Sequence, residues 1–167
     1  VATKNTSTGA ITTRMSSGMP DLTGLSISDV ATATNVTLAA DTISVINYTG
    51  AAAATMTLPA ATAGTIVVYC QSKDTTGGTA TLVFDAAGSD VFATGSVIES
   101  RGSSEVTFDT SAAGETKLTF TPANATTNLL TTGGQIAFIC YENATWHIAT
   151  KLAAETTQVT GAFVFAA

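Results

Sequence analysis

The sequence predicts an all-β protein, built as an antiparallel β-sandwich or a jelly-roll-like barrel. Short apolar segments with period-two alternation recur about every eight to twelve residues, and turns of small polar residues and glycine separate them. The β-branched residues Thr, Val and Ile are common, whereas the strong helix formers Leu, Glu, Lys and Gln are sparse. No long window shows the period of about 3.6 residues that an amphipathic helix requires.

The composition restricts the classes of partner. A chain of 167 residues fits one domain, with or without an arm, and can bury a core. Only 11% of the residues are charged, the net charge is −6 and the pI is about 4.4. We expect neither nucleic acid nor a membrane as a partner, because phosphates and anionic lipids require clustered basic residues. The basic residues are instead scattered: Lys4, Arg14, Lys73, Arg101, Lys117 and Lys151.

Neither a transmembrane helix nor a secretion signal is visible in the sequence. The longest apolar run is only a few residues, well below the roughly 20 that span a bilayer as a helix. The first residue, Val1, fits either removal of an initiator Met or cleavage of a longer precursor.

The N-terminal part of the chain is polar and rich in small residues. Val1–Met19 lacks the apolar surface needed to offset the entropy of ordering, apart from a strand-like patch at Ala10–Arg14. That stretch is therefore either disordered or an arm that orders against a neighbour, and we expect residues 1–40 to form an extended arm. Residues 41–167 are expected to form the β-sandwich domain, which closes with an apolar C-terminal strand.

Alternation of apolar and polar residues predicts the strands of the domain in chain order. They are Thr42–Tyr48, Met56–Leu58, Thr65–Ser72, Thr79–Asp85, Glu105–Asp109 and Glu115–Thr121. Pro59 ends the second of these or lies at an edge. By composition, Lys73–Gly78 is a hairpin loop. Ile66, Val68 and Cys70 share one face of their strand, and Val67 and Tyr69 share the other.

The segment Gly133–Thr150 reads as two strands and a turn, around which we expect the other strands to be layered. Gln135–Tyr141 is apolar on both faces, with Phe138 and Cys140 on one side and Ile139 on the other. Such a strand is central in a sheet, or its second face meets another subunit. Together with the apolar tail Ala162–Ala167, this pattern predicts a cyclic homo-oligomer, most simply a trimer.

The second strand of this segment contains the only Trp and the only His of the chain. Trp146 and Ile148 share one face, and His147 points the other way. We expect Trp146 to pack in the core beside Ile136, Phe138 or Val68. His147 is expected to be a solvated surface residue.

No catalytic, cofactor or metal site is predicted. His147 would need a nucleophile and an orienting carboxylate, and no G-x-S-x-G elbow is present. Two Cys and one His are too few for a tetrahedral zinc site. Five acidic residues close in sequence could supply oxygen ligands for calcium, namely Asp85, Asp90, Glu99, Glu105 and Asp109. We expect them instead to be solvated residues of hairpin loops.

The two cysteines, Cys70 and Cys140, lie in the two most apolar strands. We favour two small buried hydrophobic residues, and a single disulfide across paired strands is the alternative. Five N-glycosylation sequons begin at Asn5, Asn35, Asn47, Asn124 and Asn143, as expected by chance in a chain this rich in Ser and Thr.

The order of several short motifs resembles one family of viral modules. A strand ends in Leu58-Pro59-Ala60-Ala61, a turn at Gly64 leads into an apolar strand, and Asn-Ala-Thr-Trp146 opens the last strand. Over residues 42–150 this layout resembles the β-rich surface modules of tailed-bacteriophage virions, found in capsid decoration proteins, head fibres and tail fibres. The resemblance implies a homotrimer without enzymatic activity, and it carries over no functional residues.

On this resemblance we expect a capsid decoration protein that binds the outer surface of the head lattice, formed by the major capsid protein, and stabilises it. Such a protein would be made in the host cytoplasm and located on the outer capsid surface of the virion. The alternative is an extracellular adhesin, a receptor-binding or carbohydrate-binding module of a tail or head fibre. That function needs a platform of exposed aromatic residues, for which the candidates are Tyr48, Tyr69, Tyr141 and Trp146.

Overall fold

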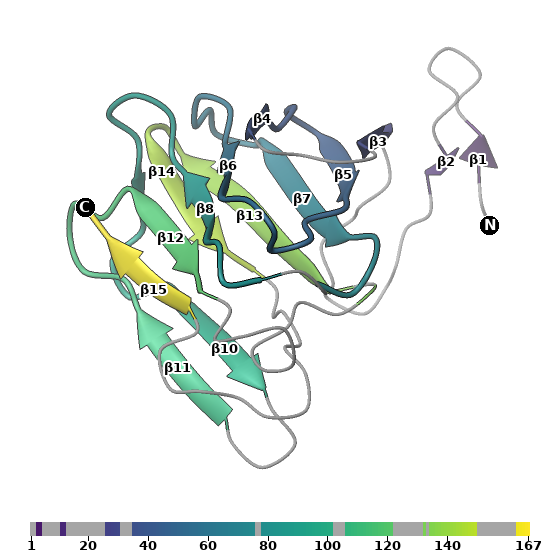
Figure 1. Ribbon diagram of the computed structural model, residues 1–167. Coiled ribbons are helices and arrows are strands. Elements are labelled where there is room, and N and C mark those ends of the chain that lie inside the picture. The colour runs from purple at the N-terminus through teal and green to yellow at the C-terminus, as the bar shows by residue number, and fades with distance from the viewer. Residues whose placement is uncertain are drawn as a thin grey trace.

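Two β-sheets face each other in the computed structural model (Figure 1). It describes residues 3–4, 11–12, 26–30, 35–75, 78–101, 106–121, 132, 134–149 and 163–167. The six-stranded sheet has the order β3 (Ser26–Val30), β5 (Thr42–Ile46), β7 (Ile66–Gln71), β13 (Gln135–Glu142), β14 (Thr145–Ile148) and β9 (Val91–Phe92). The five-stranded sheet has the order β15 (Phe163–Ala166), β12 (Lys117–Phe120), β8 (Leu82–Asp85), β6 (Ala54–Thr57) and β4 (Asn35–Thr37).

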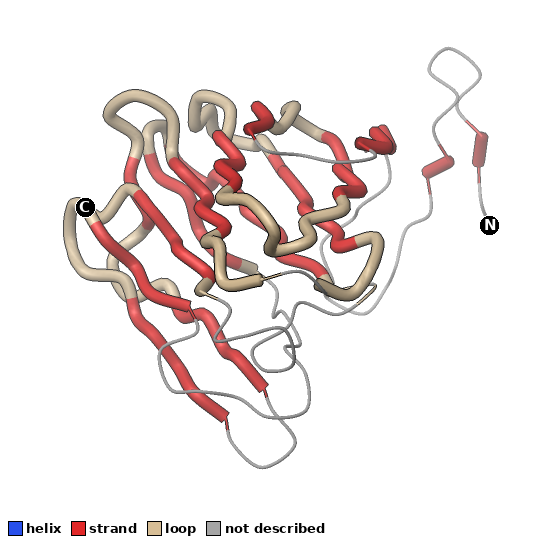
Figure 2. Tube along the Cα trace, viewed as in Figure 1, coloured by secondary structure: helices blue, strands red, loops and turns tan. Residues whose placement is uncertain are grey.

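Two further pairs of strands lie outside these sheets. β10 (Val97–Arg101) pairs with β11 (Val106–Thr110), and β1 (Thr3–Lys4) pairs with β2 (Ile11–Thr12). Strands and loops make up the whole of the described chain (Figure 2). Among these residues there is no helix with the length and apolar character needed to cross a bilayer. The predicted all-β sandwich is therefore confirmed.

The predicted antiparallel arrangement is correct for only part of the two sheets. β13 pairs antiparallel with β7 and β14, and β12 pairs antiparallel with β8 and β15. In contrast, β3, β5 and β7 run parallel, as do β4, β6 and β8, and β14 is parallel to β9. From β3 to β8 the chain enters the opposite sheet after every strand. Each strand therefore lies beside the one two before it and runs in the same direction.

This winding also corrects the prediction for Lys73–Gly78. The segment leads from β7 in one sheet to β8 in the other, so it does not close a hairpin. Its last residue, Gly78, lies close to the backbone of Gly50. A Cβ atom on Gly78 would lie 2.7 Å from the carbonyl oxygen of Gly50, which itself has a φ of +78°. Gly78 has no room for a side chain against this backbone, and the positive φ of Gly50 is a conformation that favours glycine.

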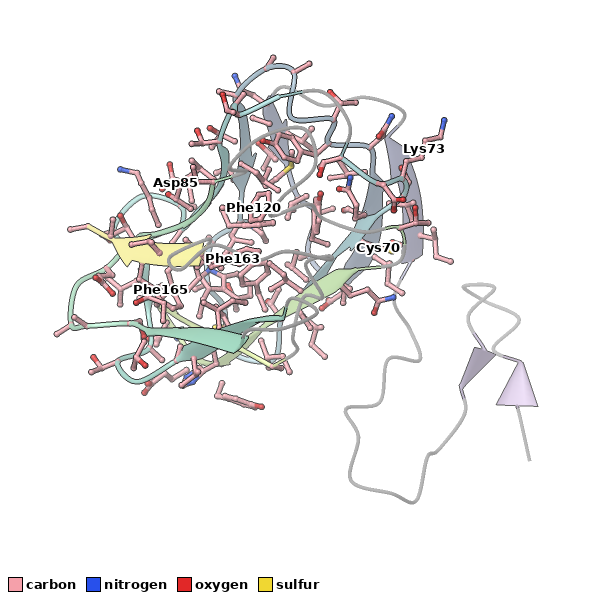
Figure 3. All side chains as sticks on the ribbon, turned by 60° about the horizontal axis from the view of Figure 1, so that its bottom comes forward. Cys70, Lys73, Asp85, Phe120, Phe163 and Phe165 are labelled. Atoms are coloured by element: carbon pink, nitrogen blue, oxygen red, sulfur yellow. The ribbon has the colours of Figure 1, made fainter. Side chains whose placement is uncertain are left out.

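The core lies between the sheets and is rich in aromatic rings. Figure 3 shows Phe120, Phe163 and Phe165 projecting between the strands. Phe120 and Phe163 lie 4.9 Å apart between ring centroids, and Phe84 and Phe138 join the two sheets at 5.3 Å. The buried phenylalanines of β15 thus fix the C-terminal strand against β12 by hydrophobic burial.

One polar network is buried with these rings. The Gln71 side-chain Nε2 donates to the Tyr48 carbonyl oxygen at 2.8 Å, and the Tyr69 hydroxyl donates to Gln71 Oε1. The Tyr48 hydroxyl donates to the Ala80 carbonyl oxygen. Burial raises the pKa of Tyr48 to about 12 and also raises that of Tyr69. The network satisfies hydrogen-bonding groups in the core. It links β7 to the segment that follows β5 and to the segment that precedes β8.

The sheets begin earlier in the chain than residue 41. Residues 26–30 form β3 beside β5, and residues 35–37 form β4 beside β6. Sheet pairing thus reaches back to Ser26, within the range 1–40 assigned to an arm. Most of Val1–Met19, on which the prediction of an arm depends, lies outside the described residues.

Candidate assembly surface

The outer face of the six-stranded sheet is mostly apolar, and the register of β3 and β5 adds one acidic position to it, Asp29 across from Val45. Strand register determines its members, because residues that alternate with the core side chains point away from the core. We call this surface the outer apolar face and define it by Ile27, Ile43, Val45, Ile66, Val68, Cys70, Gln135, Ala137, Ile139, Tyr141 and His147.

The outer face of the five-stranded sheet has the opposite character. Threonine is its main residue, and Lys117 lies across from Asp85 in the register of β12 and β8. The remaining members are Asn35, Thr37, Thr55, Thr57, Val83, Thr119, Val164 and Ala166. This surface is suited to water, as one face of a two-layer β protein commonly is. The chain therefore has one solvated outer face and one apolar outer face.

Exposure varies across the outer apolar face. Val68, Ala137 and Ile139 are buried, although none of them belongs to the core between the sheets. Ile27, on the edge strand β3, is 74% exposed, and Tyr141, next to the β13–β14 turn, is 68% exposed. The face thus has a shielded centre, and large apolar side chains remain in solvent at its margins.

The hairpin of β13 and β14 places Trp146 and His147 on opposite faces, as predicted. Trp146 is fully buried and belongs to the core cluster together with Ile136 and Phe138. Val68, the third neighbour proposed for Trp146, lies on the other side of the sheet. The indole Nε1 of Trp146 is buried and has no hydrogen-bond partner among the residues that the structure describes.

His147 is half-buried on the outer apolar face, so the expected fully solvated residue is only partly confirmed. It lies across from Ile139, and its ring and that of Tyr141 form a T-shaped pair at 4.9 Å between centroids. Its Nε2 atom is buried, and no atom in the described part of the chain forms a hydrogen bond with it. The imidazole therefore presents an unsatisfied polar atom on a surface of apolar residues.

The acidic residues proposed as calcium ligands are used separately where they are described. Asp90 Oδ2 accepts the Ala61 backbone N–H at 2.6 Å, and Asp109 Oδ2 accepts the Phe165 backbone N–H at 2.6 Å. Asp85 lies on the solvated face beside Lys117. The side chain of Glu99 and all of Glu105 are outside the described residues. Within the described ranges, no three His, Cys, Asp or Glu residues are placed to hold a metal ion.

Other carboxylates anchor loops in the same way. Asp41 Oδ1 accepts the Ile66 backbone N–H at 3.1 Å, and Glu115 Oε2 accepts that of Ala112 at 2.6 Å. Asp74 Oδ1 accepts both the backbone N–H and the hydroxyl of Thr132, and these bonds lower the pKa of Asp74. These carboxylates thus lie at loops, where they hold backbone N–H groups.

The cysteines are free and lie on opposite sides of the six-stranded sheet. Cys140 is buried in the core, and its burial raises the pKa of the thiol. Cys70 is half-buried on the outer apolar face, opposite Gln135. The alternative of a disulfide is therefore wrong, since the sheet itself separates the two sulfur atoms. The favoured prediction of two small buried residues is confirmed for Cys140 and only in part for Cys70.

Three of the four aromatic residues proposed for a sugar-binding platform are buried. Tyr48, Tyr69 and Trp146 belong to the core, and only Tyr141 is accessible. Sequence alternation had indicated that β7 and β13 are apolar on both faces. It had not indicated that Ile27, Ile43 and Val45 extend the same surface, because that requires the parallel stacking of β3, β5 and β7.

Comparison of the chain with protein-family models, curated proteins and solved structures finds no match.

Proposed function

We propose that the chain is a non-enzymatic structural protein of a tailed-bacteriophage virion, a capsid decoration protein. In this role it binds the outer surface of the head lattice, formed by the major capsid protein, and stabilises the assembled shell. It acts as a homo-oligomer, most simply a homotrimer, and is made in the host cytoplasm before it joins the virion. The observation that carries the proposal is the outer apolar face, with large apolar side chains in solvent at its margins, a surface suited to contact with protein.

The two outer faces together support an assembly role. A decoration protein needs a contact surface on one side and a solvated surface on the other. The outer apolar face provides the first, and the Thr-rich face with Lys117 and Asp85 provides the second. The described carboxylates that anchor loops are structural, because each holds a backbone N–H rather than another reactive group.

Stabilisation by such a protein follows from mass action. A protein that binds the assembled lattice and not its separated subunits favours the assembled state. One occupied site stabilises the assembled lattice by about 2.7 kcal/mol when the free decoration protein is present at 100 times its Kd. Because the lattice repeats the site many times, modest affinity per site is sufficient for a large total effect. No chemical step is required of the decorating chain.

The burial of the aromatic residues favours this proposal over an adhesin. A sugar-binding platform requires accessible rings, and the buried rings of Tyr48, Tyr69 and Trp146 cannot stack on a ligand. Tyr141 remains accessible, but its ring lies within the outer apolar face and meets His147.

Gradient-purified virions, probed with an antibody to the purified protein, test the proposal. We expect the protein to co-purify with particles and immunogold label to decorate heads. Release of the protein should lower the temperature at which heads rupture, and adding it back should restore that temperature. Label on tail fibres together with binding on a glycan array would support the adhesin instead. Absence from purified particles would refute a virion role.

A further inference from the structure

We propose that copies of this chain exchange strand β15, so that β15 of one copy completes the five-stranded sheet of the next copy. The inference rests on the homo-oligomer of the proposed function and assigns the segment that joins its subunits. A ring in which every copy gives β15 to its neighbour closes with cyclic symmetry, most simply as a trimer. The outer apolar face then stays available to the head lattice.

Strand β15 occupies a slot that one continuous part of the chain forms. On one side β15 pairs along its full length with β12, and on the other side it contacts the β10–β11 pair (Figure 1). Asp109 of β11 accepts the Phe165 backbone N–H at 2.6 Å. The ring of Phe165 also contacts the ring of Phe92 in β9 at 5.5 Å between centroids. All of these partners of β15 lie within residues 92–120.

The slot recognises β15 as a sheet edge recognises an added strand. Backbone hydrogen bonds supply the pairing, and alternate side chains enter the core. Phe163 and Phe165 are 2% and 5% exposed, whereas Val164 between them is 45% exposed. In the described sheet, β12 has no strand other than β15 on that side. The slot therefore needs a strand with an aromatic residue at every second position, and every copy carries one.

The connection to β15 is long enough to reach a second copy. The chain arrives from the six-stranded sheet, and 13 residues separate Ala149 from Phe163. Covalent geometry lets such a segment span up to roughly 45 Å. That span is about three times the radius of gyration of a folded chain of this length, roughly 15 Å. The tether therefore reaches the slot of an adjacent copy as well as its own.

Exchange preserves the packing of β15 and overcomes the charge of the chain. β15 makes the same contacts in either slot, so exchange is a low-cost route from a folded chain to an oligomer. Copies that each carry a net charge of −6 repel one another. β15 brings no charged side chain into its neighbour, and it buries the rings of Phe163 and Phe165 there. The subunits are then joined by the hydrophobic burial of a core.

Paired cysteines on β12 and β15 distinguish a neighbour's strand from the chain's own. Thr119 and Val164 are directly opposite in the register, on the solvated face. Opposite positions of an antiparallel pair have Cβ atoms about 4.5–5.5 Å apart, which a disulfide can join after a small adjustment. The full-length variant Thr119→Cys/Val164→Cys also carries Cys70→Ser, which removes the half-buried native thiol. It is treated with oxidised glutathione and run on a denaturing gel without reductant.

We expect covalent multiples of the 16.8 kDa chain, because each disulfide joins β15 of one copy to β12 of another. A band at the mass of one chain, with both introduced thiols oxidised, would overturn the proposal. Val83→Cys/Val164→Cys in the same background is the matched control. Val83 lies on β8, in the same row but one strand beyond Thr119. Its cysteine is about 10 Å from position 164, two strand spacings, so it should form no disulfide.

Weakening the slot provides a test that needs no introduced thiol. In the exchanged oligomer the bond from the Phe165 N–H to Asp109 joins two copies. Asp109→Ala should therefore raise the concentration at which the oligomer dissociates by about tenfold or more. Asp90→Ala is the matched control, because Asp90 also accepts a backbone N–H at 2.6 Å, that of Ala61, in a contact that β15 does not make.

Light scattering after size exclusion, from about 1 to 100 µM, measures this association, and circular dichroism melts verify folding. The wild type and Asp90→Ala should keep a multiple of the chain mass to lower concentration than Asp109→Ala. A wild-type mass of 16.8 kDa throughout would overturn the proposal. Equal association of the two folded variants would also overturn it.

The outcome is separable from that of the virion experiment. A protein that labels phage heads but forms the disulfide only within single chains would refute strand exchange and leave the proposed function intact. Covalent multiples of a protein that is absent from virions would do the reverse.

Discussion

Replacing Trp146 by Ala tests whether the packing of β13 and β14 holds the two sheets together. The Trp146 side chain is 0% exposed and lies in the same core cluster as Phe92 and Phe138. Burial of a Trp removes about 150–250 Å² from water, worth about 4–6 kcal/mol at roughly 25 cal/mol per Å². Measured Trp→Ala substitutions in cores cost about 3–5 kcal/mol.

The unpartnered indole N–H reduces this expectation. An unsatisfied buried donor costs about 1–3 kcal/mol, and Trp146→Ala removes that penalty together with the ring. The expected net loss in the free energy of unfolding is therefore about 2 kcal/mol, the middle of the packing loss less the middle of the relieved penalty. The total free energy of unfolding of a domain of this size is only about 5–15 kcal/mol. The variant should therefore lose a large share of its stability. Trp146→Phe keeps most of the ring and removes the N–H, and it should lie within about 1 kcal/mol of the wild type.

Urea unfolding measured by far-ultraviolet circular dichroism is the suitable assay. Fluorescence cannot compare these variants, because Trp146 is the only Trp in the chain. His147→Ala is the matched control one residue along, and it should change stability by about 0.5 kcal/mol or less. If Trp146→Ala keeps the wild-type midpoint and slope, the packing argument fails. If it also loses binding to a sugar, the adhesin alternative gains support.

Three further predictions concern the arm, the buried tyrosines and the C-terminal strand. Deleting Val1–Met19 should leave a cooperative thermal melt, because that stretch offers little apolar surface, and it should weaken binding to phage heads. Loss of the cooperative melt would show that Val1–Met19 belongs to the core. The contribution of Tyr48 and Tyr69 to the free energy of unfolding should be fully present below pH 10 and fall as the pH rises toward 12, because both hydroxyls ionise more readily once the chain is unfolded. Melts combined with phenolate absorbance at 295 nm check this, and unchanged stability up to pH 12 would contradict it. Asp109→Ala should cost about 1.5–3 kcal/mol in urea unfolding, because the Phe165 N–H loses its charged acceptor; an unchanged midpoint would show that this bond contributes little.

Local sequence determined the strands and their buried sides. Alternation placed Trp146 in the core and His147 outside it, and it separated Val67 and Tyr69 from Val68 and Cys70. These predictions succeed because side-chain direction in a strand depends only on the parity of the position. The same rule indicated that β7 and β13 have two apolar faces, which is the part of the candidate surface that sequence alone could identify.

The direction of strand pairing and the extent of the outer apolar face depended on the tertiary structure. A strand's sequence does not state whether the next strand returns beside it or crosses to the opposite sheet. Only the folded chain shows that Lys73–Gly78 crosses between sheets and that Ile27 and Ile43 are neighbours on one face. Pairing partners are selected by contacts between residues far apart in sequence, and these contacts are absent from any local window.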